Sequence, residues 1–145
     1  MGSYKAELQG NAEGKEIVVT WDTSHVFKVT LPAPVAFTEP AEGAVLSAAA
    51  APISIAFKAG GGSEPIQWSL VAECSVFPGW STGAGPMADT GSIVLTEAAF
   101  EEMIDEGGCP AKLEVERERE GSKESAREGS IKGIQARSRS FTITP

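Results

Sequence analysis

The clearest pattern in the chain is an alternation of apolar and polar residues with a period of two, which is typical of β-strands with one buried face. Over residues 52–58, Ile53, Ile55 and Phe57 fall on one side of a predicted strand. Residues 66–73 repeat the pattern after a turn rich in glycine. These two segments predict an antiparallel pair at the centre of a β-sheet.

Further segments with strand-like patterns are separated by clusters of Gly, Pro, Ser and Asp, which favour turns. Many short strands with turns between them, and no alternation with long helices, predict an all-β fold built as a two-sheet sandwich. The additional predicted strands cover residues 4–8, 15–21, 25–31, 93–95, 111–120 and 131–143.

One short helical segment is predicted near residues 97–105, where Phe100, Met103 and Ile104 are spaced at i, i+3 and i+4. Thr96 is placed to cap this segment at its start. The two prolines at positions 32 and 34 cannot continue a central strand, so we place a boundary there. The prediction is a sandwich domain over 31–145, with 1–30 as extra N-terminal strands or an arm packed on it.

Composition limits the kinds of partner. The chain has 145 residues, enough for one domain, and a formal net charge of −8. This charge opposes binding to nucleic acids and to anionic membranes, which requires clustered Lys and Arg. The sequence contains no apolar stretch long enough for a transmembrane segment. The start Met1-Gly2-Ser3 lacks the features of an export signal, so we expect a native signal or lipid anchor to be missing here.

Several short motifs resemble known β-sandwich domains. Residues 38–43, 52–57 and 67–70, followed by Cys74, resemble strands A, B and C of fibronectin type III or immunoglobulin-like domains. Residues 89–93, Cys109, 113–115 and 134–141 are similar to poorly characterised secreted or lipid-anchored proteins of myxobacteria-like bacteria. The resemblance implies that Trp68 is a buried strand-C tryptophan, and it brings no catalytic residues and no agreed ligand. We expect no cofactor.

The same resemblance bears on Cys74 and Cys109. If the strand that ends near Cys74 and the strand that begins near Cys109 are neighbours, as strands C and F are, the two sulfurs could meet. The alternative is two separate thiols. A disulfide would imply an extracytoplasmic location, meaning a secreted, periplasmic or outer-surface protein.

One motif suggests catalysis. Gly79-Trp80-Ser81-Thr82-Gly83 fits the nucleophile elbow of serine hydrolases, which needs a strand before it, a helix after it and a histidine later in the chain. Here a loop rich in Gly and Pro surrounds the motif, and the single histidine, His25, lies upstream. We therefore expect no enzyme activity.

The remaining polar clusters also favour structural interpretations. His25 with Asp22 and Ser24 is interpreted as a polar turn, and a single histidine argues against a transition-metal site. The carboxylates at 101, 102, 105 and 106 lack the spacing of a calcium loop, so no metal is predicted. Glu114, Glu116 and Glu118 form a ladder on one strand face, for which the last strand is expected to supply balancing cations. The candidate cations are Lys132, Arg137 and Arg139.

The candidate binding loop covers residues 75–91, where Phe77, Trp80 and Met87 lie among glycines and prolines. Loops on a rigid scaffold often carry binding residues, although this one could instead fold back to cap the sandwich. The leading hypothesis is a non-catalytic interaction domain of a cell-envelope or secreted protein, which binds a protein partner through loop or edge-strand contacts. The alternatives are a structural subunit of a surface fibre or coat, in which arm 4–8 joins a neighbour's sheet, and a carbohydrate-binding module.

Overall fold

The computed structural model of the chain describes residues 5–7, 13–21, 25–74, 78–101, 108–123 and 129–145. Strands dominate this part of the chain, and the all-β prediction is confirmed. Two 3₁₀ turns, η1 (Ala48–Ala50) and η2 (Glu97–Ala99), lie between strands. The strands are β1 (Glu16–Trp21), β2 (His25–Thr30), β3 (Ala36–Glu39), β4 (Ala44–Ser47), β5 (Ile53–Lys58), β6 (Ile66–Glu73), β7 (Pro78–Met87), β8 (Ser92–Leu95), β9 (Cys109–Glu120), β10 (Ser122–Lys123) and β11 (Lys132–Thr144).

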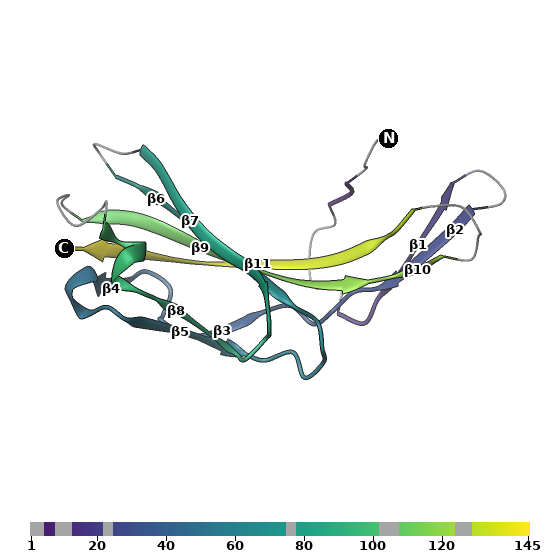
Figure 1. Cartoon of the computed structure of the whole chain (residues 1–145), viewed down its shortest axis with the longest axis horizontal. Helices are drawn as coiled ribbons and strands as arrows, with labels where there is room; N and C mark the ends of the chain where they lie inside the picture. Colours follow the sequence, from purple (N-terminus) through teal and green to yellow (C-terminus); the bar gives the residue numbers. More distant parts are fainter. Residues whose placement is uncertain (1–4, 8–12, 22–24, 75–77, 102–107, 124–128) are drawn as a thin grey trace.

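The strands form a sandwich and a separate small sheet (Figure 1). One layer of the sandwich is five-stranded, in the order β4-β11-β9-β6-β7, and the other is three-stranded, in the order β3-β5-β8. The long strands β9 and β11 run out of the sandwich toward a second three-stranded sheet, β1-β2-β10, which we call the distal sheet. The molecule is therefore elongated, with the sandwich at one end and the distal sheet at the other.

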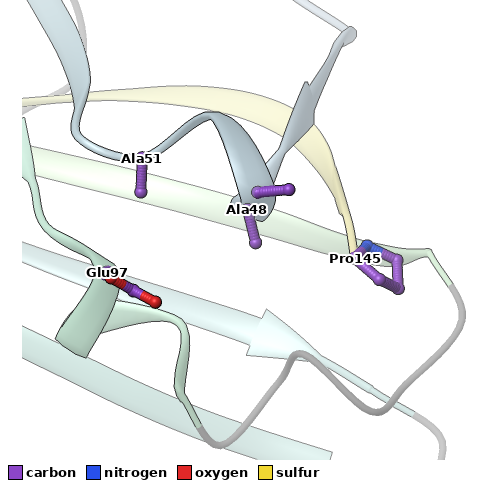
Figure 2. Close-up of a pocket in the computed structure, with 5 residues that line it drawn as sticks. Ala48, Ala51, Glu97 and Pro145 are labelled. Carbon is purple, nitrogen blue, oxygen red and sulfur yellow. The ribbon is translucent and has the colours of Figure 1, made fainter.

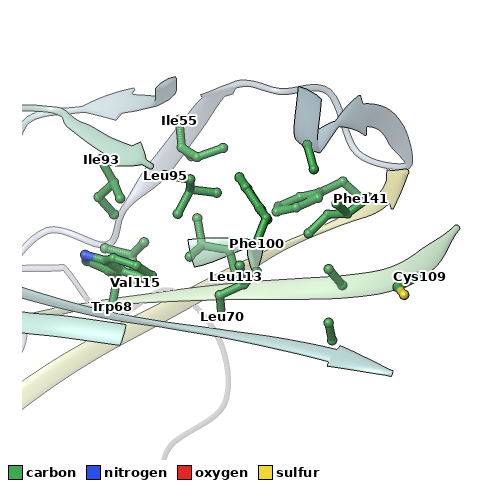
Figure 3. Packing of buried hydrophobic residues seen from close by; sticks show 14 of the residues in the cluster. Ile55, Trp68, Leu70, Ile93, Leu95, Phe100, Cys109, Leu113, Val115 and Phe141 are labelled. Carbon is green, nitrogen blue, oxygen red and sulfur yellow. The ribbon is translucent and has the colours of Figure 1, made fainter. Parts of the chain in front are cut away.

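The hydrophobic core lies between the two layers of the sandwich (Figure 3). The alternation predicted for β6 is confirmed, since its residues are buried and exposed in strict turn and Trp68 is among the buried ones. Phe100, just after η2, is fully buried and lies among side chains of both layers (Figure 3). Burial of each such side chain stabilises the fold by about 1.5–3 kcal/mol. Both layers contribute large side chains, among them Ile55, Phe57, Ile93 and Leu95 from one and Leu70, Leu113, Val115 and Phe141 from the other.

Some predicted elements differ from the structure. Within the helical segment predicted near 97–105, Glu97–Ala99 form the 3₁₀ turn η2 and the Thr96 side chain makes no capping hydrogen bond. Residues 102–107 lie outside the described residues. The side chain of Phe100, which follows η2, is fully buried. Residues 5–7 of the predicted arm form no strand. The sequence pattern also missed β3 and β4, which are each four residues long.

Two glycines allow the distal sheet to join the sandwich. At the end of β2, Val29 and Leu31 lie against the β9–β11 pair beside Gly121 and Gly133. A Cβ on Gly133 would lie 2.9 Å from a methyl carbon of Val29 and 3.0 Å from one of Leu31. A Cβ on Gly121 would collide with the backbone carbonyl of Lys28. The close crossing of β2 over these strands therefore requires glycine at both positions.

A buried ion pair fixes the same junction. Arg117 of β9 is 1% exposed, and its Nη2 lies 2.8 Å from Oδ2 of Asp89, which precedes β8. Asp89 also accepts hydrogen bonds from the backbone N–H groups of Gly60 and Gly91. The guanidinium donates further hydrogen bonds to the backbone carbonyls of Ala33, Pro34 and Lys58. One side chain thus connects the linker after the distal sheet to both layers of the sandwich.

Candidate interaction surface

The structure joins Cys74 and Cys109 in a disulfide, with their Cα atoms 4.9 Å apart. The strands that carry them, β6 and β9, are antiparallel neighbours, and Ala72 lies opposite Ala111 in the register. Both cysteines are buried at the end of the core. The predicted pairing is confirmed, and the bridge links two buried residues of neighbouring strands.

The candidate binding loop takes a different form from the one expected. Most of residues 75–91 belong to β7, an edge strand antiparallel to β6. Met87 ends this strand opposite Ile66 and is 39% exposed. Trp80 pairs through its backbone with Ala72, whereas Phe77 lies outside the described residues. Pairing with β6 explains the difference, because a neighbouring strand can hold a glycine-rich segment extended without a strong strand pattern of its own. Binding by these three residues stays a prediction.

The catalytic-looking motif Gly79–Gly83 lies entirely within β7. A nucleophile elbow needs a sharp turn between a strand and a helix, and this motif is instead extended along a sheet edge. Asp22 and Ser24 of the polar cluster near His25 lie outside the described residues, as do three of the four carboxylates near position 105. Among described residues, no group of three or more His, Cys, Asp or Glu side chains could hold a metal ion.

Two hollows in the described surface are lined by few ionisable side chains. One, of about 350 Å³, lies at the end of the sandwich and is lined by Ala48, Ala49, Ala51, Glu97 and Pro145 (Figure 2). The other, of about 490 Å³, lies along β6 and β7, where Gly83 and Gly85 leave the strand without side chains. The first contains a single ionisable side chain and the second contains none, so neither hollow resembles an active site.

One of the three cations expected to balance the glutamate ladder, Lys132, forms ion pairs with glutamates of β9. Lys132 contacts Glu118 at 2.8 Å and Glu120 at 3.4 Å, and its hydrogen bond to Glu118 is the main cause of its raised pKa. The strand register places Arg137 opposite Val115 and Arg139 opposite Leu113, on the core side of the sheet. The register therefore starts both arginines on the face opposite the ladder, because side chains alternate between the faces of a strand. Arg139 instead lies 5.2 Å from the ring of Phe37.

Most exposed strand edges of the sandwich carry features that discourage pairing with another chain. β7 contains Pro78 and Pro86, and β3 has a register shift beside Glu39. β4 and β8 are four residues long. β4 covers only part of one edge of β11. On the rest of this edge, side chains bond to the backbone: Arg137 donates to the carbonyl of Ala136, and Glu42 accepts from the N–H of Ser140.

The outer edge of β1 lacks these protections. This six-residue strand pairs in continuous register with β2 alone, and no other described residue pairs with its free edge. It contains no proline, and its single charge is Glu16 at the first position. Val18 is 49% exposed and Val19 is 42% exposed, and these neighbours point to opposite faces of the sheet. β1 is therefore an apolar edge strand open to solvent on both faces.

The charge of the distal sheet also differs from that of the whole chain. Its three strands contain Glu16, Lys28 and Lys123, which sum to +1 against −8 for the chain. An acidic partner protein is therefore repelled less strongly by the distal sheet than by the sandwich of this chain. The signal for this surface was present in the sequence as the run Ile17-Val18-Val19, which is apolar on both faces of a predicted strand. The sequence pattern instead favours the arm 4–8 and the loop 75–91 as binding elements.

Comparisons with protein-family models, with curated proteins and with solved structures find no match. The similarity to secreted proteins of myxobacteria-like bacteria therefore stays a prediction. Within the described residues, no helix has the length and apolar character needed to cross a membrane. The assignment of function rests on the fold, the disulfide and the surface of the distal sheet.

Proposed function

We propose that the protein is a non-catalytic, extracytoplasmic interaction domain that binds a protein partner through the free edge of β1. The observation that carries this proposal is the contrast between the protected edges of the sandwich and the open, apolar edge of β1. An open edge strand presents a row of unpaired N–H and C=O groups to which another strand can add. Exposed valines on both faces give an added strand apolar neighbours.

The strand order supports an immunoglobulin-like scaffold for this domain. In immunoglobulin-like sandwiches, strands A, B and E share one sheet and strands C, F and G share the other. β3, β5 and β8 correspond to the first set, and β6, β9 and β11 to the second. On this correspondence, β9 and β11 are an extended F–G hairpin that carries the distal sheet away from the sandwich (Figure 1).

The disulfide supports the proposed compartment. Cytosolic thiols are kept reduced, whereas proteins of the periplasm, the cell surface and the extracellular space retain such bridges. Cys74 and Cys109 are both buried, which protects the bond from reductants. The protein isolated from cells that make it is expected to contain no alkylatable thiol until it is denatured and reduced.

Site-specific photocrosslinking in the producing cells tests the proposed partner surface. A photoreactive amino acid replaces Val18 in one variant and Val94 in the other. Val94 is a matched control, because it is an equally exposed valine (51% against 49%) on another edge strand, β8. The Val18 variant is expected to give a discrete protein adduct that mass spectrometry identifies, and the Val94 variant is expected to give none.

Equal adduct patterns from the two positions, or no adduct at position 18, would overturn the proposal. Adducts to a different protein and adducts to a second copy of this chain both support it, because the proposal concerns the surface. Mass spectrometry of the crosslinked peptides separates these two cases.

A further inference from the structure

We infer that the occupant of the β1 edge is the β1 strand of a second copy of this chain, paired antiparallel about a two-fold axis at Val18. This inference rests on the proposed function and specifies its partner. It follows from the geometry of the free edge, from the side chains that would meet across it, and from the charge of the distal sheet.

The backbone of β1 shows which groups are free. The N–H of Leu31 donates to the carbonyl of Lys15, so the polar groups of Lys15 point toward β2. Backbone groups of successive residues in a strand alternate in direction. The backbone N–H and C=O groups of Ile17 and Val19 therefore also point toward β2, where these residues lie opposite Val29 and Phe27. The polar groups that point away from β2 belong to Glu16, Val18 and Thr20.

Only one two-fold register uses all three of these residues. With Val18 opposite Val18 of the second copy, Glu16 lies opposite Thr20, and every outward N–H meets an outward carbonyl. A shift of two residues in either direction leaves one of the three without a counterpart on β1. Because an unpaired backbone group loses hydrogen-bond energy when it is buried, the centred register is the most stable one.

The side chains in this register are compatible on both faces. On one face the two Val18 side chains meet, and on the other Ile17 lies opposite Val19 of the second copy. Cross-strand pairs of β-branched residues stabilise antiparallel sheets. Glu16 faces Thr20, so no like charges are opposed. The two distal sheets would then form one continuous six-stranded sheet, in which both exposed valines gain apolar neighbours.

Electrostatics favour this end of the molecule for self-association. Two copies carry −8 each and repel one another over most of their surface, whereas the strands of the distal sheet carry +1. The sandwiches lie at the far ends of such a dimer, because the distal sheet is at the opposite end of each chain (Figure 1). Since salt screens the remaining repulsion, the dimer is expected to strengthen as ionic strength rises.

Sedimentation of the purified full chain over a range of concentrations provides the first test. The wild type is expected to pass from monomer to dimer as concentration rises, and Val18→Lys is expected to raise the dissociation constant at least about tenfold, which corresponds to about 1.4 kcal/mol. The matched variant Val94→Lys, at a valine of similar exposure on β8, is expected to dimerise like the wild type. Circular dichroism of each variant checks that it is folded.

Cysteine crosslinking tests the register. Val18→Cys places two sulfurs opposite each other at the axis, where Cα atoms of a hydrogen-bonded pair lie about 5.5 Å apart, within disulfide range. Thr20→Cys lies on the same face, but the two copies of residue 20 are four residues out of register, about 13 Å apart along the strand. Mild oxidation is expected to give a covalent dimer with Val18→Cys and none with Thr20→Cys.

Three results would overturn the inference: a monomer at all concentrations, a dimer unaffected by Val18→Lys, or equal crosslinking at positions 18 and 20. The proposed function has a separate criterion. If the purified chain is monomeric while the photoreactive group at position 18 captures a different protein in cells, the second-copy inference fails and the interaction surface stands.

Discussion

The guanidinium of Arg117 and the carboxylate of Asp89 form an ion pair in which neither side chain is more than 4% exposed. Five further hydrogen bonds surround the pair, three from the guanidinium to backbone carbonyls and two from backbone N–H groups to Asp89. These bonds reach the linker after the distal sheet and both layers of the sandwich. We therefore expect the pair to fix the orientation of the distal sheet relative to the sandwich.

Removal of the cation is expected to destabilise the whole domain. Arg117→Met leaves the buried carboxylate of Asp89 without its partner, which typically costs about 3–5 kcal/mol. Urea unfolding followed by tryptophan fluorescence measures the change in the free energy of unfolding. Lys132→Met is the matched control, because it removes an ion pair from a solvent-exposed cation and should have little effect. Equal stabilities of the two variants would contradict the role assigned to Arg117.

Acid stability is expected to depend on Glu64. A hydrogen bond with its own backbone and a second one from Arg119 lower the pKa of Glu64 below the ordinary value of 4.5. A lowered pKa in the folded state contributes stability above the unfolded value, and this stability is lost as pH falls through the folded pKa. Glu64→Gln is therefore expected to flatten the decline of stability below pH 4.5. Unfolding curves at a series of pH values measure how the free energy of unfolding depends on pH. The same slope in Glu64→Gln as in the wild type would refute the role assigned to Glu64.

The disulfide is expected to make a large contribution to stability. Cys74 and Cys109 are separated by 35 residues, for which the chain-entropy model gives a contribution of about 4 kcal/mol. The Cys74→Ala, Cys109→Ala double variant should lose about this amount in urea unfolding. Under non-reducing conditions, the intact wild type should also weigh two hydrogens less than its reduced form. A double variant as stable as the wild type would show that the bridge adds nothing to the packing around it.

The crossing of β2 is expected to be sensitive to a single methyl group. Gly133→Ala would place a Cβ 2.9 Å from a methyl carbon of the buried Val29, and such overpacking costs about 1–3 kcal/mol. Gly108→Ala is the matched control, because its Cβ would meet nothing closer than 3.4 Å. Thermal unfolding compares the two variants. Similar melting temperatures would mean that the distal sheet does not depend on this contact.

The sequence predicted much of the sandwich because its strands carry a strong two-residue period. β5, β6 and the paired strands β9 and β11 agree closely with the segments expected, and Cys74 and Cys109 meet as the C and F strands of the resemblance implied. The sequence failed where the pattern was weak. β7 is rich in glycine, so its sequence predicts a loop, whereas pairing with β6 holds it in the sheet.

For the candidate site, too, the sequence determined some features and the tertiary structure determined the others. The alternation of apolar residues determined which face of each long strand is buried, because burial repeats every second residue along an extended chain. Only the tertiary structure decided that Arg117 is buried, that β2 crosses at Gly121 and Gly133, and that no described strand covers the outer edge of β1. Each of these depends on which strands are neighbours, and neighbours are chosen by packing between segments far apart in the chain.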